Sequence, residues 1–359
     1  MSRPAPSNTP LPYQALALQT TCFAVNRCES EEQTRDCMMK NIARVHRQVL
    51  ASKGFIGPDL KLVVVPEYFL TSYPLGETLP SWAAKAAIAP DGPEYARLGD
   101  LCRDTGIYFS GNAYETDLHF PGFYFQTSFI IDDSGNTVLR YRRLVSMFAP
   151  TPHDLWDRYL QIYGLDGVFP VADTPLGKLA CVASEEILYP EIARTLALRG
   201  AEVLLHSSSE VASPRLTPKD IAKRARAFEN SVWLVSANSA GIRDADIPEN
   251  SVDGMSKVVD YLGEVRAEAG YGESMVANAT IDLAASRRHR CKPGMGNMLS
   301  RQRLELFAST YAGTVYPPNN MLDARGQPAV PERTHFMGTQ RQTIERLVAR
   351  NVIAGDASE

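Results

Sequence analysis

The sequence lacks the features that mark several large classes of protein. Of its 359 residues, 37 are basic and 41 are acidic, and no long basic run stands out. A nucleic-acid or membrane surface is therefore not indicated, and small molecules or proteins are the expected partners. No apolar run is long enough to span a membrane, and the polar, proline-rich start has no apolar core of a secretory signal. These absences predict a soluble, cytoplasmic protein.

Cysteine is also scarce. The six cysteines lie far apart, without the CxxC pairs typical of zinc sites, and they suggest no disulfide framework. Most of them are expected to be small, buried hydrophobic residues. No metal ion and no cofactor are predicted.

The chain alternates segments typical of strands and of helices. Short strands outnumber the helices, and a hairpin interrupts the alternation, which favours two stacked mixed sheets with helices outside over one parallel sheet. The predicted strands cover residues 15–25, 61–65, 107–111, 124–131, 138–141, 203–205, 232–237, 256–260 and 275–281. The predicted helices cover residues 41–51, 95–105, 190–198, 218–230 and 340–351, with a short helix in an insertion at 150–167.

One domain with two terminal extensions is the expected organisation. Residues 1–12 are expected to be disordered, residues 13–285 to form the domain, and residues 286–359 to form a C-terminal extension. This extension has scattered glycine and proline after a basic start. Two interpretations stay open: an arm that packs on a neighbouring subunit, and a tail folded over its own domain.

Residues 179–205 are the segment from which the candidate site is predicted. An apolar run ends at a short turn, a helix follows, and a second apolar run comes after Gly200. This order places Ser184 at a strand-to-helix elbow, where a side chain meets substrate and a following helix contributes its N-terminal dipole. Ser184 is therefore a candidate nucleophile.

Six blocks of sequence resemble, in order, the successive blocks of the nitrilase superfamily, the carbon-nitrogen hydrolases. They are VVVPEYF at 63–69, GNTVLRYRR at 135–143, GKLACVASEEILYPEIAR at 177–194, RGAEVLL at 199–205, RARAFENSVWLVSAN at 224–238 and DGMSKVVDYLGEV at 253–265. The resemblance spans roughly residues 13 to 285. It implies an α/β fold, a nitrilase-like αββα sandwich that dimerises through its helical faces, so a homodimer or higher homo-oligomer is expected.

The resemblance also implies a catalytic glutamate, lysine and cysteine, of which this chain keeps one. Glu67 matches the glutamate, Arg143 stands where the family has lysine, and Ser184 stands where it has cysteine. Cys181 does not replace the missing thiol, because residues three apart on a strand point to opposite faces. A Glu67–Arg143–Ser184 site retains charge stabilisation and loses thiol reactivity, since a hydroxyl is far less acidic than a thiol.

Four further residues are predicted to take part in substrate binding: Tyr68, Glu186, His206 and Asp154. A Ser184–His206 pair would make a serine-hydrolase arrangement, although a histidine satisfied by hydrogen bonds at a strand end is the commoner case. Glu186 is expected mainly to order the elbow. Asp154, beside a histidine on the insertion, fits a pocket lid or a metal pair, with a solvated loop as the plainest alternative.

Three interpretations of the site remain open. The first is a divergent amidase-like hydrolase that acts on a small amide or related acyl compound. The second is a catalytically silent member of the fold with a binding or regulatory role. The third is a laboratory replacement of cysteine by serine, against which Arg143 argues, because such a replacement rarely changes two catalytic positions.

Overall fold

The computed structural model describes residues 10–211, 213 and 215–355. The disorder expected for residues 1–12 therefore lies largely outside the described residues. Among those described, no helix is both apolar enough and long enough to cross a membrane.

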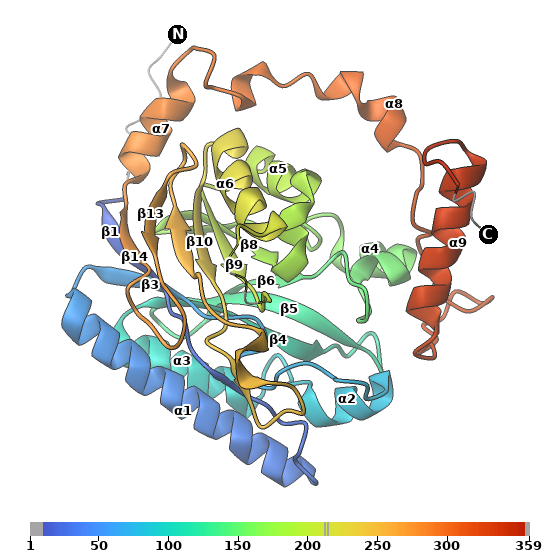
Figure 1. Cartoon of the computed structure of the whole chain (residues 1–359), viewed down its shortest axis with the longest axis horizontal. Helices are drawn as coiled ribbons and strands as arrows, with labels where there is room; N and C mark the ends of the chain where they lie inside the picture. The colour runs from blue at the N-terminus through green and yellow to red at the C-terminus, as the bar shows by residue number, and fades with distance from the viewer. Residues whose placement is uncertain (1–9, 212, 214, 356–359) are drawn as a thin grey trace.

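Two six-stranded sheets stack face to face, and helices cover their outer faces (Figure 1). The first sheet has the order β14–β1–β3–β4–β5–β6. Its strands are β14 (Asn278–Ile281), β1 (Tyr13–Ala17), β3 (Leu60–Val64), β4 (Tyr108–Thr116), β5 (Tyr124–Ile131) and β6 (Thr137–Arg142). The second sheet has the order β13–β12–β10–β9–β8–β7. Its strands are β13 (Val265–Glu268), β12 (Lys257–Val259), β10 (Trp233–Ala237), β9 (Val203–Ser207), β8 (Gly177–Ala183) and β7 (Ala172–Thr174).

Helices on both sides complete the predicted αββα sandwich. Figure 1 shows α1 and α3 against the first sheet, and α5 and α6 against the second. The α-helices are α1 (Glu31–Ile56), α2 (Leu79–Ala86), α3 (Pro93–Thr105), α4 (Trp156–Tyr163), α5 (Pro190–Leu198), α6 (Pro218–Asn230), α7 (Leu283–Cys291), α8 (Ala308–Tyr311) and α9 (His335–Ala349). The short 3-10 turns are η1 (Pro152–Leu155), η2 (Ser184–Leu188), η3 (Glu249–Ser251), η4 (Leu299–Arg301) and η5 (Leu304–Leu306), and β2 (Cys22–Phe23) pairs with β11 (Ile242–Arg243) apart from the two large sheets.

Strand alternation separates two hydrophobic cores. Along β3, Leu62 and Val64 face the core between the sheets, whereas Val63 faces the core under α1 and α3. Both sets are fully buried, as a strand packed on both faces requires. In the second sheet, β9 begins with the apolar residues Val203, Leu204 and Leu205, and its polar residues His206 and Ser207 come where the strand ends.

Most predicted elements are confirmed, and the differences have local causes. The strand expected at residues 15–25 is two strands, β1 and β2, separated by Gln19, Thr20 and Thr21. Gln19 and Thr21 bond to the loop at 270–273, and Thr20 bonds to Gln48 on α1. The helix expected at 41–51 is the longer α1, which Ser30 caps by accepting a hydrogen bond from the Gln33 N–H. Elements α2, α7 and β13 are not among the predicted ones.

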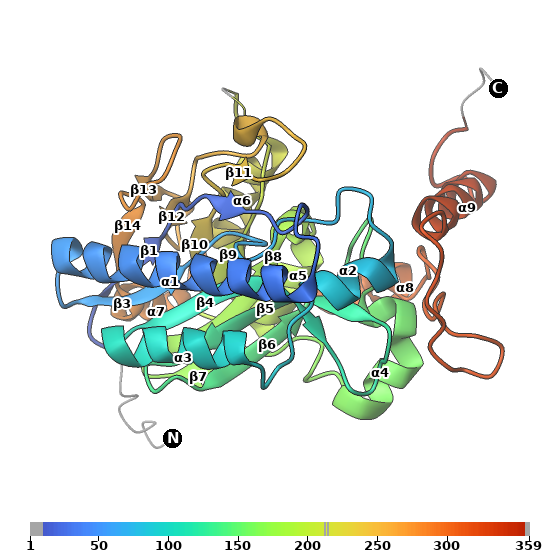
Figure 2. The same cartoon turned by 90° about the horizontal axis from the view of Figure 1, so that it is seen from below.

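The C-terminal extension leaves the sandwich after α7 and arches to the opposite side, where α9 lies near α4 (Figures 1 and 2). Its contacts there are with its own chain. The backbone N–H of Asn319 donates to the His153 carbonyl over 3.0 Å, and Arg333 Nη1 donates to the Gly76 carbonyl over 2.8 Å. Phe336 at the start of α9 is 5% exposed. These contacts match a tail folded over its own domain, and packing on a neighbouring subunit stays a prediction.

Candidate active site

The three predicted catalytic residues follow strands that end on the same side of the sandwich. Glu67 comes shortly after β3, Arg143 directly after β6, and Ser184 directly after β8. All three side chains line one cavity with a volume of about 660 Å³. The structure therefore brings the acid, the guanidinium and the hydroxyl to one cavity, and the chemical role of each stays a prediction.

Ser184 adopts the elbow conformation that its place in the sequence predicts. Its φ is 49°, a left-handed backbone conformation that costs energy for a residue with a Cβ and is often found at functional sites. β8 ends at the preceding residue, η2 begins at Ser184, and Pro190 starts α5 six positions later. Among the described residues, no hydrogen bond engages the Ser184 hydroxyl, so it is available to a ligand in the cavity.

His206 holds the backbone of the elbow through a hydrogen bond. Its Nε2 lies 2.8 Å from the Ser184 carbonyl oxygen, and because a carbonyl only accepts, Nε2 carries the proton. Nδ1 then accepts from the Ser236 hydroxyl over 2.8 Å. Burial, followed by the charge of Lys223, lowers the pKa of His206 well below its usual value, so the ring is neutral.

This geometry argues against the Ser184–His206 catalytic pair and against a substrate contact by His206. The ring is fully buried, both of its nitrogens are occupied, and it holds the backbone of Ser184 instead of its hydroxyl. His206 is thus a residue that positions the elbow.

Glu186 also orders the elbow, as the sequence led us to expect. It is fully buried and accepts hydrogen bonds from the backbone N–H groups of Leu144, Val145 and Ala183 and from the Tyr141 hydroxyl. Burial raises the pKa of Glu186 to about 7, against the opposing effect of Arg143 and these donors. Because both carboxylate oxygens are engaged, Glu186 ties the end of β6 to the end of β8 and does not line the cavity.

Arg143 is held by a ring of acceptors. Its Nε donates to the Val145 carbonyl over 2.7 Å, and its Nη1 donates to Gln126 Oε1 over 2.8 Å. Nη1 also lies 3.4 Å from Glu67 Oε1, and Nη2 donates to Glu185. A guanidinium has five N–H donors, so among the described residues these four acceptors leave one N–H, on Nη2, for a ligand.

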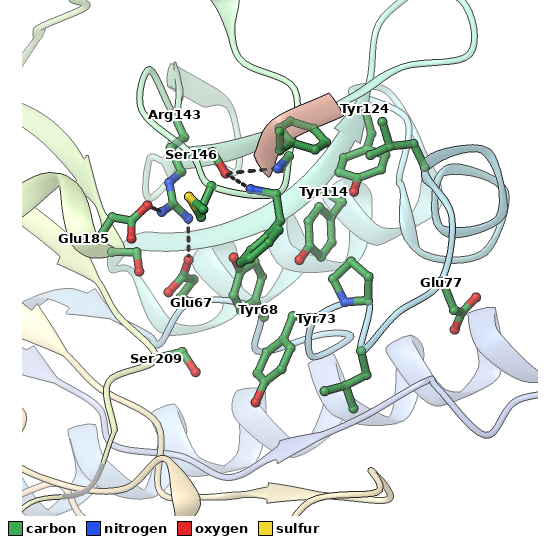
Figure 3. Close-up of a pocket in the computed structure, with 18 of the residues that line it drawn as sticks. Glu67, Tyr68, Tyr73, Glu77, Tyr114, Tyr124, Arg143, Ser146, Glu185 and Ser209 are labelled. Carbon is green, nitrogen blue, oxygen red and sulfur yellow. Dashed lines mark hydrogen bonds and ion pairs between the residues drawn. The ribbon is translucent and has the colours of Figure 1, made fainter. Parts of the chain in front are cut away.

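Arg143 keeps its positive charge. Burial acts to lower its pKa, but the acidic groups Tyr68, Glu67 and Glu185 outweigh burial and raise the pKa above the ordinary value of arginine. Figure 3 shows Arg143, Glu67 and Glu185 pointing toward one another at one end of the cavity. This end is a fixed cation flanked by two carboxylates.

The other predicted binding residues fall in different places. Tyr68 lines the cavity beside Glu67 and has a φ of 56°. Asp154 lies instead on a second cavity of about 770 Å³, between the insertion and α9. It is buried and accepts from Thr151 and Asn320, so it fixes the insertion and the extension to each other. A direct contact of Asp154 with a ligand at Ser184 is not supported. Within the described residues, no group of three or more His, Cys, Asp or Glu could hold a metal ion.

Sequence reasoning missed Gln126, which contacts Glu67 without lining the cavity, and several residues that line it. Gln126, whose side-chain N–H donates to Glu67, was detectable as the one amide in the apolar run of β5. The missed cavity residues carried no signal, because distant segments supply them. They include Tyr73, Tyr114, Tyr124, Lys219, Arg333 and Phe336.

Cys181 has the buried position expected of it. It is fully buried, and its sulfur lies 3.8 Å from the Ser110 hydroxyl across the two sheets. Burial raises the pKa of the Cys181 thiol to about 12, so the thiolate needed for nucleophilic attack is absent near neutral pH.

Comparison with known proteins agrees with the fold and with the motifs. Curated relatives include a probable nitrilase of Schizosaccharomyces pombe, 26% identical over 63% of this chain and 77% of the relative, and a nitrilase of Pyrococcus abyssi, 30% identical over 64% and 80%. A formamidase of Pseudomonas syringae is 28% identical over 66% of this chain and 64% of its own length.

Solved structures show the same fold. A nitrilase-superfamily member from Saccharomyces cerevisiae superposes with a TM-score of 0.62 at 21% identity, covering 80% of this chain and 96% of that one. A cysteine-to-serine variant of an amidase from Nesterenkonia, also of the nitrilase superfamily, superposes with a TM-score of 0.54 at 20% identity, covering 84% and 98%. The carbon-nitrogen hydrolase family model matches residues 17–290, and the chain therefore belongs to the carbon-nitrogen hydrolase family.

Proposed function

We propose that the protein is an amidase-like hydrolase that acts on a small amide or related acyl compound through a Glu67–Arg143–Ser184 site. The observation that carries the proposal is the position of Ser184: a hydroxyl free of hydrogen bonds among the described residues, on a left-handed elbow, in the cavity that Glu67 and Arg143 also line. Relatives named as nitrilases and formamidases support the reaction class.

The chemistry would follow acyl transfer in two steps. Ser184 Oγ attacks the amide carbonyl carbon while Glu67 takes the hydroxyl proton and passes it to the leaving amine. The remaining Nη2 donor of Arg143 stabilises the oxyanion that forms. A water molecule that loses a proton to Glu67 then attacks the Ser184 ester, and Glu67 returns the proton to Ser184 Oγ as the bond from Oγ to the acyl carbon breaks and the carboxylic acid is released. Arg143 stays charged throughout, so it contributes charge and no proton.

The second candidate is a binding or regulatory protein without turnover. The observation that favours it is that Glu67 already contacts Gln126 and Arg143, and that no hydrogen bond joins it to the Ser184 hydroxyl among the described residues. A base must reach the proton that it abstracts. Ligand binding would then stabilise the fold without releasing ammonia.

One panel of variants separates the two candidates. Ammonia release from a set of small amides is measured for the native chain, Ser184→Ala, and the double variant Ser184→Cys with Arg143→Lys. The hydrolase proposal expects native turnover that Ser184→Ala abolishes. A silent native chain in which only the double variant releases ammonia would reject that proposal in favour of the binding protein.

A further inference from the structure

The end of the cavity away from Arg143 is formed by tyrosines. Figure 3 shows Tyr124 and Tyr114 on the side away from Arg143, with Tyr68 between Arg143 and Tyr114. The Tyr68 and Tyr114 rings are stacked with centroids 5.1 Å apart, and the Tyr114 and Tyr124 rings meet edge to face at 5.0 Å. Tyr73 adds a fourth ring, 6.0 Å from Tyr68. Such a wall suits a flat, apolar group.

One hydroxyl in this wall has no partner. Tyr124 is 1% exposed, and its hydroxyl makes no hydrogen bond to any described residue. Burial raises the pKa of Tyr124 above the usual value for tyrosine, so the hydroxyl keeps its proton and can donate it. A buried hydroxyl without a partner is unfavourable, and when it lines a cavity it marks where a ligand group can bond.

The cavity is also large for the simplest amides. Its volume of about 660 Å³ lies within the range of sites that hold drug-sized ligands. Apolar side chains line it beside the tyrosines, among them Leu75, Leu79, Phe148 and Phe336. An amide with a one-carbon acyl group would leave most of this space and the Tyr124 hydroxyl unused.

From these observations we propose that the site selects amides whose acyl group carries an aromatic ring with a hydrogen-bonding substituent at its far end, which bonds to Tyr124. The inference rests on the proposed function for the position of the amide at Ser184. The ring packs on Tyr68 and Tyr114, and the substituent reaches the otherwise unpartnered hydroxyl. A site built to bond a polar group discriminates against analogues that lack the group, since its own buried hydroxyl is then left unpaired.

The test separates binding from turnover. Phenylacetamide and 4-hydroxyphenylacetamide are titrated calorimetrically into Ser184→Ala, with Tyr124 intact and with Tyr124→Phe added. We expect the hydroxylated amide to bind about tenfold tighter when Tyr124 is intact, the value of one net hydrogen bond, and the ratio to fall to about one in Tyr124→Phe. Tyr108→Phe is the matched control: Tyr108 is buried in the core between the sheets, outside this cavity, and its removal should leave the ratio unchanged.

Each result has one meaning. Equal affinities with Tyr124 intact, a ratio that survives Tyr124→Phe, or no binding of either amide would overturn the inference. If the ratio behaves as expected but the native chain releases no ammonia from either amide, the subsite stands and the proposed hydrolase function fails.

Discussion

Two regions of this protein bury opposite charges, and they do so to different ends. In the candidate active site, Arg143 lies between Glu67 and Glu185 on the wall of a cavity. A second group, here named the lysine cluster, consists of Lys223, Glu210, Asp220 and Lys257 between α6, the segment after β9, and β12. Both regions contain paired carboxylates and cations, and all of them except Glu185, whose side chain is 35% exposed, are nearly inaccessible to solvent.

The lysine cluster lies outside the catalytic cavity. Lys223 Nζ bonds Glu210 over 2.7 Å, Lys257 Nζ bonds Asp220 over 2.6 Å, and none of the four lines the catalytic cavity. Its charges act on the site only from a distance, because the charge of Lys223 helps to keep His206 neutral beneath the elbow. Buried charge alone therefore does not identify an active site. The distinguishing features are the cavity and the free hydroxyl on a strained backbone.

The largest expected effect comes from replacing the acid on the cavity. Glu67→Gln removes the proposed base but retains a side chain of the same shape, so kcat should fall by about 10²–10⁴-fold with the protein still folded. Initial rates with an amide substrate, and circular dichroism for folding, are the measurements. A variant with native kcat would remove Glu67 from the mechanism.

The matched change in the lysine cluster should affect stability instead. Glu210→Gln leaves Lys223 buried with only the more distant carboxylate of Asp220, 3.8 Å away, and breaking the pair with Glu210 costs about 3 kcal/mol of unfolding free energy. Urea unfolding measures the loss, and kcat per folded molecule should stay near the native value. A Glu210→Gln variant that is as stable as the native chain but has a much lower kcat would show that the lysine cluster serves catalysis and not stability.

A smaller effect is expected from Arg143→Lys. A lysine keeps the charge but cannot reach Val145, Gln126 and Glu185 together, because it lacks the planar fork of a guanidinium. We expect kcat/KM to fall about tenfold, the value of one lost charge-assisted hydrogen bond. Arg143→Met, which also loses the charge, should lower kcat/KM further. Equal rates for the lysine and methionine variants would show that the charge itself is not used.

The smallest effect concerns the pH dependence of stability. The pKa of Glu186 rises from its ordinary 4.5 to about 7 in the fold, so its contribution is greatest below about pH 4.5 and falls as the pH rises through 7. The stability advantage of the native chain over Glu186→Gln should therefore shrink between pH 5 and pH 7 in urea unfolding. An advantage that grows over this range would mean that the donors around Glu186 favour its ionised form.

The sequence predicted the fold best where local rules decide. Helices α5 and α6 were predicted to the residue, because each begins with a proline at its first turn, and the strand β5 was predicted equally well. The paths that depend on distant contacts were not predictable in this way. The extension that brings Arg333 and Phe336 to the cavity is the clearest example.

In the candidate site too, residues set by local sequence were predictable, and residues brought together by distant contacts were not. Glu67, Arg143 and Ser184 were predictable because each follows a strand end and matches a family motif. The tyrosine wall was not, since Tyr68, Tyr114 and Tyr124 come from separate segments whose meeting only the folded chain reveals. His206 shows the converse: its sequence position left open a substrate contact and a histidine satisfied by hydrogen bonds, and its contacts show the second, a support for the elbow.

The most direct test of the account is a search for an acyl group on Ser184. The native chain is mixed with 4-nitrophenyl acetate, quenched in acid within the first turnover, digested, and analysed by mass spectrometry beside Ser184→Ala. The account predicts one acetyl group on the peptide that contains Ser184, absent from the variant and strongly reduced in Glu67→Gln. Acetylation of Cys181 or of another residue, with Ser184 unmodified, would contradict it.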